Sequence, residues 1–163
     1  MFYGARCCKA VLDNDTMNYI MFGKGTKPLV ILPGLGDGLA PVHVQLQAVI
    51  FAINYKKFAE QFKVYIFSRK NSLTENYSTR DMAEDQAEVM KTLGISKTYV
   101  MGVSQGGMIA QYLAVDHPEL VEKLVLAVTL PGPNETMRKT VNGWKKMAEE
   151  CQYKNLMIDT AEN

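Results

Sequence analysis

A serine at position 104 lies in a pattern that can support nucleophilic chemistry. Residues 102–106 have the sequence Gly-Val-Ser-Gln-Gly and match the pattern G-x-S-x-G. The preceding residues, TYVMGV, predict a strand, and MIAQYLAV after the motif predicts a helix. The motif requires this strand–turn–helix setting, because the sharp turn raises the serine hydroxyl above the edge of the sheet. Ser104 is therefore the candidate nucleophile, and the surrounding glycines leave room for strand and helix to approach closely.

A glycine-rich loop is the second element that could contribute to chemistry. The apolar run Pro28–Leu32 predicts a strand buried on both faces, and the loop Pro33–Gly38 follows it directly. The loop contains neither a Gly-Lys-Ser/Thr sequence nor GxGxxG, which argues against the common phosphate-binding loops. A plain turn between a strand and a helix is the simplest alternative.

The rest of the sequence predicts the elements that hold these residues. Two apolar runs separated by the turn Asp13-Asn14-Asp15 predict a hairpin. Strand and helix patterns then alternate, which predicts an α/β fold with a mostly parallel sheet. The expected strands are Cys7–Leu12, Met17–Phe22, Pro28–Leu32, Val64–Phe67, Thr98–Val103 and Lys123–Val128, and the expected helices are Val42–Phe62, Ser78–Leu93 and Gln105–Val115.

Local signals add detail to two of these helices. Ser78 is expected to cap its helix, with Asp81 three residues later in a near capping box, and Gly94 is expected to stop it. A polar stretch from Ser68 to Tyr77 precedes this helix. The helix Val42–Phe62 has an amphipathic pattern, and the apolar residues near one face are Leu46, Val49, Ile50, Ile53 and Phe58.

Three blocks of the sequence resemble the α/β-hydrolase superfamily, and the resemblance covers essentially the whole chain. LVILPGLGDG at 29–38 is similar to the family's strand and oxyanion loop, and residues 77–95 to the helix before the nucleophile strand. GVSQGGMIAQYLAVDHPELVEKLVL at 102–126 resembles the nucleophile elbow, its helix and the next strand. The family's loop Asp-x-Arg-Gly-x-Gly-x-Ser is Ser-Arg-Lys-Asn-Ser at 68–72, so Arg69 is retained and the glycines are not.

The resemblance implies a role for each matching residue. Ser104 would attack an acyl carbon, the backbone N–H groups of Gln105 and Leu35 would form the oxyanion hole, and Gly34 would border the substrate. The implied activity is that of an esterase- or lipase-like serine hydrolase, which cleaves an ester, thioester or amide of a small apolar acyl substrate through an acyl-enzyme. No cofactor or metal ion is implied. The alternatives are a non-catalytic α/β-hydrolase-like binding module and an acyltransferase.

A base for Ser104 is not evident in the sequence. A serine hydroxyl is a poor nucleophile without a base, and the family's chain order is Ser, then Asp or Glu, then His. His117 is expected at the far end of the helix after Ser104, about 18 Å away, and His43 precedes the serine. Glu135, the nearest carboxylate after the last strand, is expected at the start of a helix. The chain on its own is therefore expected to be nearly inactive.

The C-terminal segment predicts a separate helical region. Pro131-Gly132-Pro133 breaks the chain, and five apolar residues then recur at helical spacing; they are Met137, Val141, Trp144, Ala148 and Cys151. We expect a core at 1–131 and the start of a helical cap at 132–163, with Trp144 as a candidate substrate contact. The fold is expected to be incomplete at the C-terminus, because the family takes its acid and histidine from later strands. The strand Lys123–Val128 would then be an edge, open to a homodimer or to a missing C-terminal half.

Composition narrows the range of partners. The formal net charge is +1, with no basic stripe or acidic tail, so a small molecule is expected as partner rather than nucleic acid. The three cysteines have neither a disulfide framework nor metal-ligand spacing. The sequence shows neither a signal-peptide pattern nor an apolar run long enough to span a bilayer, which predicts a cytoplasmic protein.

Overall fold

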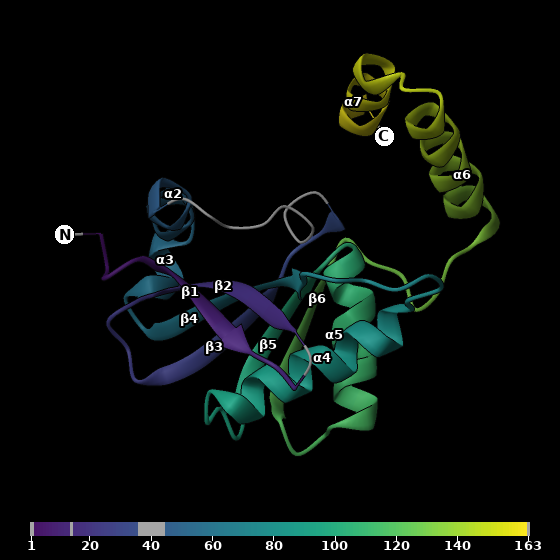
Figure 1. The fold of residues 1–163 in the computed structure, drawn as a ribbon. Helices are drawn as coiled ribbons and strands as arrows, with labels where there is room; N and C mark the ends of the chain where they lie inside the picture. The colour runs from purple at the N-terminus through teal and green to yellow at the C-terminus, as the bar shows by residue number, and fades with distance from the viewer. Residues whose placement is uncertain (1, 14, 36–44, 163) are drawn as a thin grey trace. The chain divides into compact units, whose positions relative to one another are not determined.

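Six strands form one sheet in the order β1-β2-β4-β3-β5-β6 (Figure 1). The computed structural model describes residues 2–13, 15–35 and 45–162. β1 and β2 form an antiparallel hairpin, β2 pairs antiparallel with β4, and β4, β3, β5 and β6 run parallel. The predicted α/β fold with an N-terminal hairpin is confirmed. The strands are β1 (Arg6–Val11), β2 (Thr16–Phe22), β3 (Lys27–Leu32), β4 (Phe62–Lys70), β5 (Thr98–Val103) and β6 (Val121–Ala127).

The hydrophobic core is divided between the two faces of the sheet. In β3, Val30 and Leu32 pack in one cluster, whereas Leu29 and Ile31 pack in the other. Because alternate residues face opposite sides, a shift of one residue in register would exchange the two sets. The first cluster includes residues of the helices α4 and α5, and the second includes residues of α2 and α3. These helices are α2 (Gln45–Asn54), α3 (Lys56–Ala59), α4 (Thr79–Thr92) and α5 (Gln105–Asp116).

The two ends of α4 agree with the local sequence signals. The Ser78 side chain accepts a hydrogen bond from the backbone N–H of Asp81 at 3.1 Å, and the Asp81 carboxylate accepts one from the N–H of Ser78 at 2.8 Å. This reciprocal pair is a complete capping box. At the other end, Gly94 has φ +68, a backbone conformation that favours glycine. The predicted start and end of this helix are therefore confirmed.

The strand expected at Val64–Phe67 is longer than predicted, because polar residues that would suit a loop are buried in the sheet. β4 continues to Lys70, where it pairs with Met17 of β2. The Ser68 carbonyl accepts a hydrogen bond from Gln86 Nε2 of α4 at 3.2 Å, and Arg69 is also hydrogen-bonded. Buried polar groups are tolerated when they have such partners.

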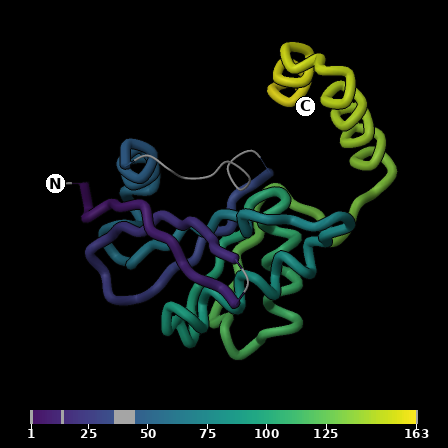
Figure 2. The backbone as a smooth tube through the Cα atoms, viewed as in Figure 1, coloured from purple at the N-terminus to yellow at the C-terminus, as the bar shows by residue number. Residues whose placement is uncertain are grey.

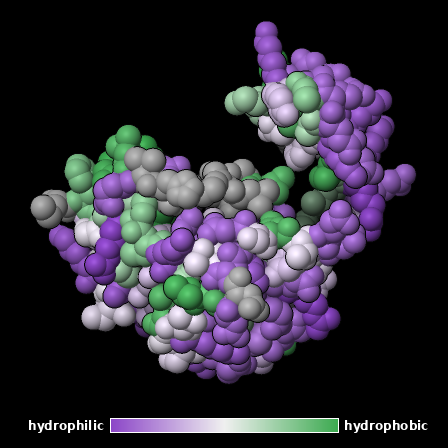
Figure 3. All heavy atoms as spheres, viewed as in Figure 1, coloured by the Kyte–Doolittle hydropathy of each residue, from purple (hydrophilic) through white to green (hydrophobic). Residues whose placement is uncertain are grey.

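The helix expected at Val42–Phe62 is shorter than predicted, and its buried face is a different one. Residues 42–44 lie outside the described part of the chain; α2 ends at Asn54, α3 follows, and Phe62 already belongs to β4. The residues of α2 that are fully buried are Ala48 and Ala52, and their small side chains let the helix lie close to the sheet. The larger Leu46, Ile50 and Ile53 are exposed, whereas Phe58 of α3, also expected on that face, packs partly buried against the second cluster. Figure 3 shows apolar atoms gathered over α2.

Residues 131–163 form a second compact unit, and residues 1–130 form the first (Figure 2). The second unit contains α6 (Glu135–Glu149) and α7 (Tyr153–Glu162). Asn134 caps α6, and Trp144 Nε1 donates a hydrogen bond to Asp159 Oδ2 of α7 at 2.6 Å. Cys151, expected in the apolar stripe, lies between the helices with φ +57. Among the described helices, none is long and apolar enough to cross a membrane.

The outer edge of β6 leads to a prediction about association. Among the described strands β6 pairs only with β5. It carries Glu122 and Lys123 near its start, but its last four residues, LVLA, contain no charge or proline. Val125 and Leu126 are 53% and 43% exposed. Because an apolar edge strand is a template for pairing with another chain, we expect the 18.2 kDa chain to self-associate in size-exclusion chromatography with light scattering.

Two lysine substitutions test whether β6 is responsible. Val125→Lys is expected to shift the chain toward the monomer, because a charge disfavours edge pairing. Val11→Lys on β1, the opposite edge of the sheet, is the matched control and should leave association unchanged. A monomeric wild-type chain would contradict the prediction.

Candidate functional site

The C-terminal ends of β3 and β5 bring the predicted site residues together. These strands are parallel neighbours, and Leu32 pairs with Gly102. Gly34 follows β3 and Ser104 follows β5, so both lie at the same edge of the sheet. A Cβ placed on Gly34 would lie 3.4 Å from the Cβ of Ser104 and 3.9 Å from its Oγ. Gly34 therefore lies beside the Ser104 side chain.

Ser104 has an unusual backbone conformation. Its φ is +52 and its ψ is −120, and the residue is exposed at the N-cap of α5. A serine at an N-cap commonly uses its hydroxyl to accept a hydrogen bond from the first turn. Ser78 does so, with φ −84 and ψ 165, whereas the Ser104 side chain makes no cap hydrogen bond. The strained turn thus directs the hydroxyl away from its usual structural role.

The surrounding structure holds this turn through the backbone N–H and carbonyl groups of Ser104. The Ser104 carbonyl accepts hydrogen bonds from Thr129 Oγ1 at 2.7 Å and from the Gly107 N–H at 2.9 Å. The Ser104 N–H donates to the carbonyl of Ala127, the last residue of β6, at 3.0 Å. Val128 then has φ +49 immediately before Thr129. Such anchoring allows a strained residue to persist, and the sequence alone did not indicate the role of Thr129.

Glycines make the close packing at the elbow possible. A Cβ on Gly106 would lie 2.0 Å from the carbonyl oxygen of Leu32, and one on Gly102 would lie 2.6 Å from the Gly106 carbonyl oxygen. A Cβ on Gly107 would lie 2.5 Å from the Thr129 side chain. Real Cβ atoms do not approach other atoms so closely. The N-terminal turn of α5 therefore lies directly against the end of β3.

The two expected oxyanion donors follow neighbouring strands. Gln105 is the first residue of α5, and Leu35 follows Gly34 after β3. Leu35 is 43% exposed. N–H groups in the first turn of a helix have no intrahelical acceptor, and the helix dipole favours negative charge there. Gln105 therefore places a backbone N–H at the positive end of α5, next to Ser104.

A buried arginine, Arg69, lies behind these donors. Arg69 belongs to β4 and is 3% exposed. Its Nη2 donates hydrogen bonds to the carbonyl oxygen of Pro33 at 2.9 Å and to Gln105 Oε1 at 3.1 Å. Burial lowers the pKa of Arg69 to about 10, so the guanidinium stays protonated at neutral pH. The family resemblance shows that this arginine is retained, but the sequence does not predict its contacts.

The histidine that the structure describes lies far from Ser104. His117 is the C-cap of α5, and 12 helical residues separate it from the elbow, a length of about 18 Å. Its Nε2 lies 3.0 Å from a carboxylate oxygen of Glu84, and its Nδ1 lies 3.4 Å from one of Glu119. His43 and residues 36–38 of the glycine-rich loop lie outside the described residues. Among the described ones, no His, Cys, Asp or Glu cluster suits a metal ion.

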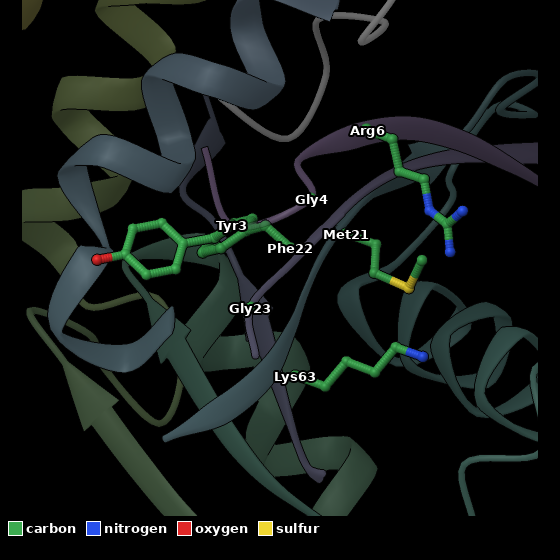
Figure 4. A pocket seen from close by; sticks show the side chains of 7 residues that line it. All are labelled: Tyr3, Gly4, Arg6, Met21, Phe22, Gly23 and Lys63. Carbon is green, nitrogen blue, oxygen red and sulfur yellow. The ribbon is translucent and has the colours of Figure 1, made fainter. Parts of the chain in front are cut away.

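A cavity of about 350 Å³ opens beside the N-terminal end of β4 (Figure 4). It is bordered by the end of β2 and the start of β4, whereas Ser104 lies at the C-terminal ends of the parallel strands. The side chains of Arg6, Met21 and Lys63 extend to one side of these strands, and Tyr3 extends to the other. This cavity does not belong to the candidate site.

A serine in a strained strand–turn–helix, next to a glycine loop at the end of the neighbouring strand, is the arrangement of an α/β hydrolase. The comparison with family models agrees. Residues 27–154 match the alpha/beta hydrolase fold family, and the chain belongs to that family.

Relatives with assigned names include several hydrolases. The chain is 41% identical over 135 residues to fluoroacetate dehalogenase of Burkholderia sp, covering 80% of this chain and 43% of that protein. It is 31% identical over 145 residues to RutD of Serratia proteamaculans (strain 568), which has the provisional name carbamate hydrolase, covering 83% and 46%. Epoxide hydrolase 1 of Caenorhabditis elegans is 28% identical over 136 residues, covering 83% and 33%. The chain spans less than half the length of these curated relatives.

Solved structures show the same fold. The epoxide hydrolase CorEH without ligand has a TM-score of 0.70 at 24% identity, over 86% of this chain and 50% of that chain. A hydrolase from Pseudomonas aeruginosa PA01 has a TM-score of 0.68 at 21% identity, over 90% and 56%.

The strain at Ser104 leads to a prediction with an internal control. Ser104→Gly should raise the free energy of unfolding by about 1 kcal/mol relative to Ser104→Ala, because glycine removes the cost of a positive φ. At Ser78, glycine and alanine should both destabilise the chain, alanine by about 1 kcal/mol, because the cap is lost. Urea unfolding of the four variants measures both effects. Equal stability of Ser104→Gly and Ser104→Ala would mean that the turn stores no strain.

Proposed function

We propose that the chain carries the nucleophile and oxyanion hole of a serine hydrolase that acts on acyl substrates. The observation that carries the proposal is the conformation of Ser104, an exposed N-cap serine with φ +52 whose hydroxyl does not cap its own helix. Gly34, where an added Cβ would lie 3.9 Å from Ser104 Oγ, is proposed to border the substrate.

The proposed reaction has two steps. Ser104 Oγ forms a bond to the acyl carbon, and the N–H groups of Gln105 and Leu35 stabilise the resulting oxyanion. The carbonyl then re-forms and the bond to the leaving group breaks; the hydroxyl proton passes through a base to that group. Water cleaves the acyl-serine ester in the second step and restores the hydroxyl. Loss of one oxyanion donor typically slows such reactions about 100- to 1000-fold.

The chemistry of a serine nucleophile favours acyl substrates over alkyl ones. Attack on a carbonyl produces an ester, which water can hydrolyse in the second step. Attack on an epoxide or on the carbon of a C–F bond would produce a serine ether, which has no carbonyl for water to attack. A serine nucleophile at position 104 therefore suits a carbamate, the substrate in the name of RutD, better than the epoxide or fluoroacetate in the names of the other relatives. Esters, thioesters and amides share this acyl carbon.

The proposed substrate is small and largely apolar. Leu35 is exposed beside the site, and the segment 132–163 is proposed as the start of a cap with Trp144 as a substrate contact.

Acyl transfer would use the same serine with another acceptor in place of water. The proposed location is the cytoplasm.

A binding module is the second candidate function. It is favoured by the position of His117, the histidine among the described residues, which lies at the opposite end of α5 from Ser104. A chain without a base near the serine could bind an acyl ligand without cleaving it.

A fluorophosphonate probe distinguishes the two functions. Its reaction joins Ser104 Oγ to phosphorus, displaces fluoride and releases the hydroxyl proton to solvent. The hydrolase needs a base for Ser104, so in a protein that carries this base we expect labelling at Ser104 by mass spectrometry, and no labelling of Ser104→Ala. Ser78→Ala is the matched control, since it removes another exposed N-cap serine and should label like the wild type.

Substrate class is tested on the same proteins. An activated ester such as p-nitrophenyl acetate should leave an acetyl group on Ser104, whereas styrene oxide and fluoroacetate should leave no adduct. Binding of these compounds without any adduct would favour the binding module. Turnover of the ester at about 10 per second, an ordinary enzyme rate, would show that a base acts on Ser104, and His43→Ala would then be the variant to measure.

A further inference from the structure

One guanidinium nitrogen contacts both halves of the proposed oxyanion hole. Arg69 Nη2 donates to the carbonyl oxygen of Pro33 and to the side chain of Gln105. The Pro33 carbonyl belongs to the peptide that enters Gly34, one residue before the donor Leu35. Gln105 supplies the other donor from its backbone. Arg69 therefore connects the loop after β3 to the turn after β5.

The sheet order explains how one side chain can reach both. β3 lies between β4 and β5, and all three strands are parallel. Arg69 is near the C-terminal end of β4, at the edge where the other two strands also end. A residue of a neighbouring strand thus spans the loop and the nucleophile turn.

The charge of Arg69 has no counter-ion among the described residues. No described carboxylate forms a salt bridge with it, and its Nε and Nη1 atoms are buried without a hydrogen-bond partner in the described part of the chain. By contrast, Arg80 forms a bidentate salt bridge with the carboxylate of Asp116 at the surface. A buried cation without a counter-ion is a poor way to stabilise a fold. Its burial becomes more favourable when negative charge develops nearby.

We propose that Arg69 is a positioning residue that holds the oxyanion loop and Gln105 together and favours the anionic intermediate formed at Ser104. The proposal rests on the proposed function of Ser104. Arg69 acts through Pro33 and Gln105 and does not itself touch the substrate.

The rate of fluorophosphonate reaction at Ser104 tests this role. Arg69→Gln keeps a hydrogen-bond donor but removes the charge and shortens the side chain. We expect Ser104 in this variant to react about 10- to 100-fold more slowly, a smaller effect than the loss of one oxyanion donor. Arg69→Lys keeps the charge and should recover most of that loss. Arg80→Gln removes a surface arginine and should react within about twofold of the wild type.

Gln105→Ala provides a test that keeps the arginine itself in place. It removes the acceptor of Arg69 but keeps the backbone N–H, and we expect a reduction of about fivefold in rate. In the double variant with Arg69→Gln the two effects should be less than multiplicative, because both substitutions break the same connection. If the Arg69 variants do not fold, an unchanged rate in Gln105→Ala overturns the proposal.

Amide hydrogen exchange at Leu35 and Gln105 separates this proposal from the proposed function. Faster exchange at both amides in Arg69→Gln, with wild-type exchange in Arg80→Gln, supports positioning even if the wild type does not label. Absence of wild-type labelling would count against the proposed function alone. Unchanged exchange together with an unchanged labelling rate in a folded Arg69→Gln would overturn the role of Arg69.

Discussion

At Gly106, the backbone of α5 lies so close to the end of β3 that a single methyl group would meet the Leu32 carbonyl oxygen at 2.0 Å. The site depends on this contact. It brings the start of α5 to the loop after β3, and so places Gly34 against the side chain of Ser104. It also requires the sharp turn at Ser104, because the chain must reverse direction within one residue between β5 and α5. The Thr129 side chain packs against Gly107 and hydrogen-bonds the Ser104 carbonyl.

The topology of the sheet determines which groups meet at this contact. Three adjacent parallel strands end at one edge, and each contributes one part of the site. β5 contributes the serine, β3 the loop with Gly34 and Leu35, and β4 the cation of Arg69. Ligand sites of parallel sheets generally lie beyond the carboxyl ends of the strands. The cavity lined by Arg6 and Lys63 lies at the opposite ends of the strands, away from this site.

Much of this arrangement could be predicted from local sequence. The hairpin, the alternating strands and helices and the capping box at Ser78 all depend on residues close together in the chain. The elbow was predictable because its glycines and serine form a short motif. The buried face of α2 was not, because close packing on the sheet favoured Ala48 and Ala52 over larger neighbours.

The contacts of Arg69 and Thr129 could not be predicted for a related reason. Each side chain meets partners from distant parts of the chain, and no local pattern specifies such contacts. Ser68 and Arg69 have the composition of a loop, and only their burial against other elements makes them part of β4. The two serines at helix N-caps also show that packing, and not local sequence, decides the backbone conformation. Ser78 and Ser104 are alike in residue type and position, yet only packing around Ser104 imposes a positive φ.

The pairing of β3 with β5 has a consequence for the order of folding. Leu32 and Gly102 pair in the sheet, although β4 and α4 separate them along the chain. Contacts between such distant residues form slowly, because closing a long loop costs entropy before the contact compensates for it. The hairpin and the individual helices can assemble earlier from local interactions. The strained turn at Ser104 depends on this long-range pairing, and we expect it to form late in folding.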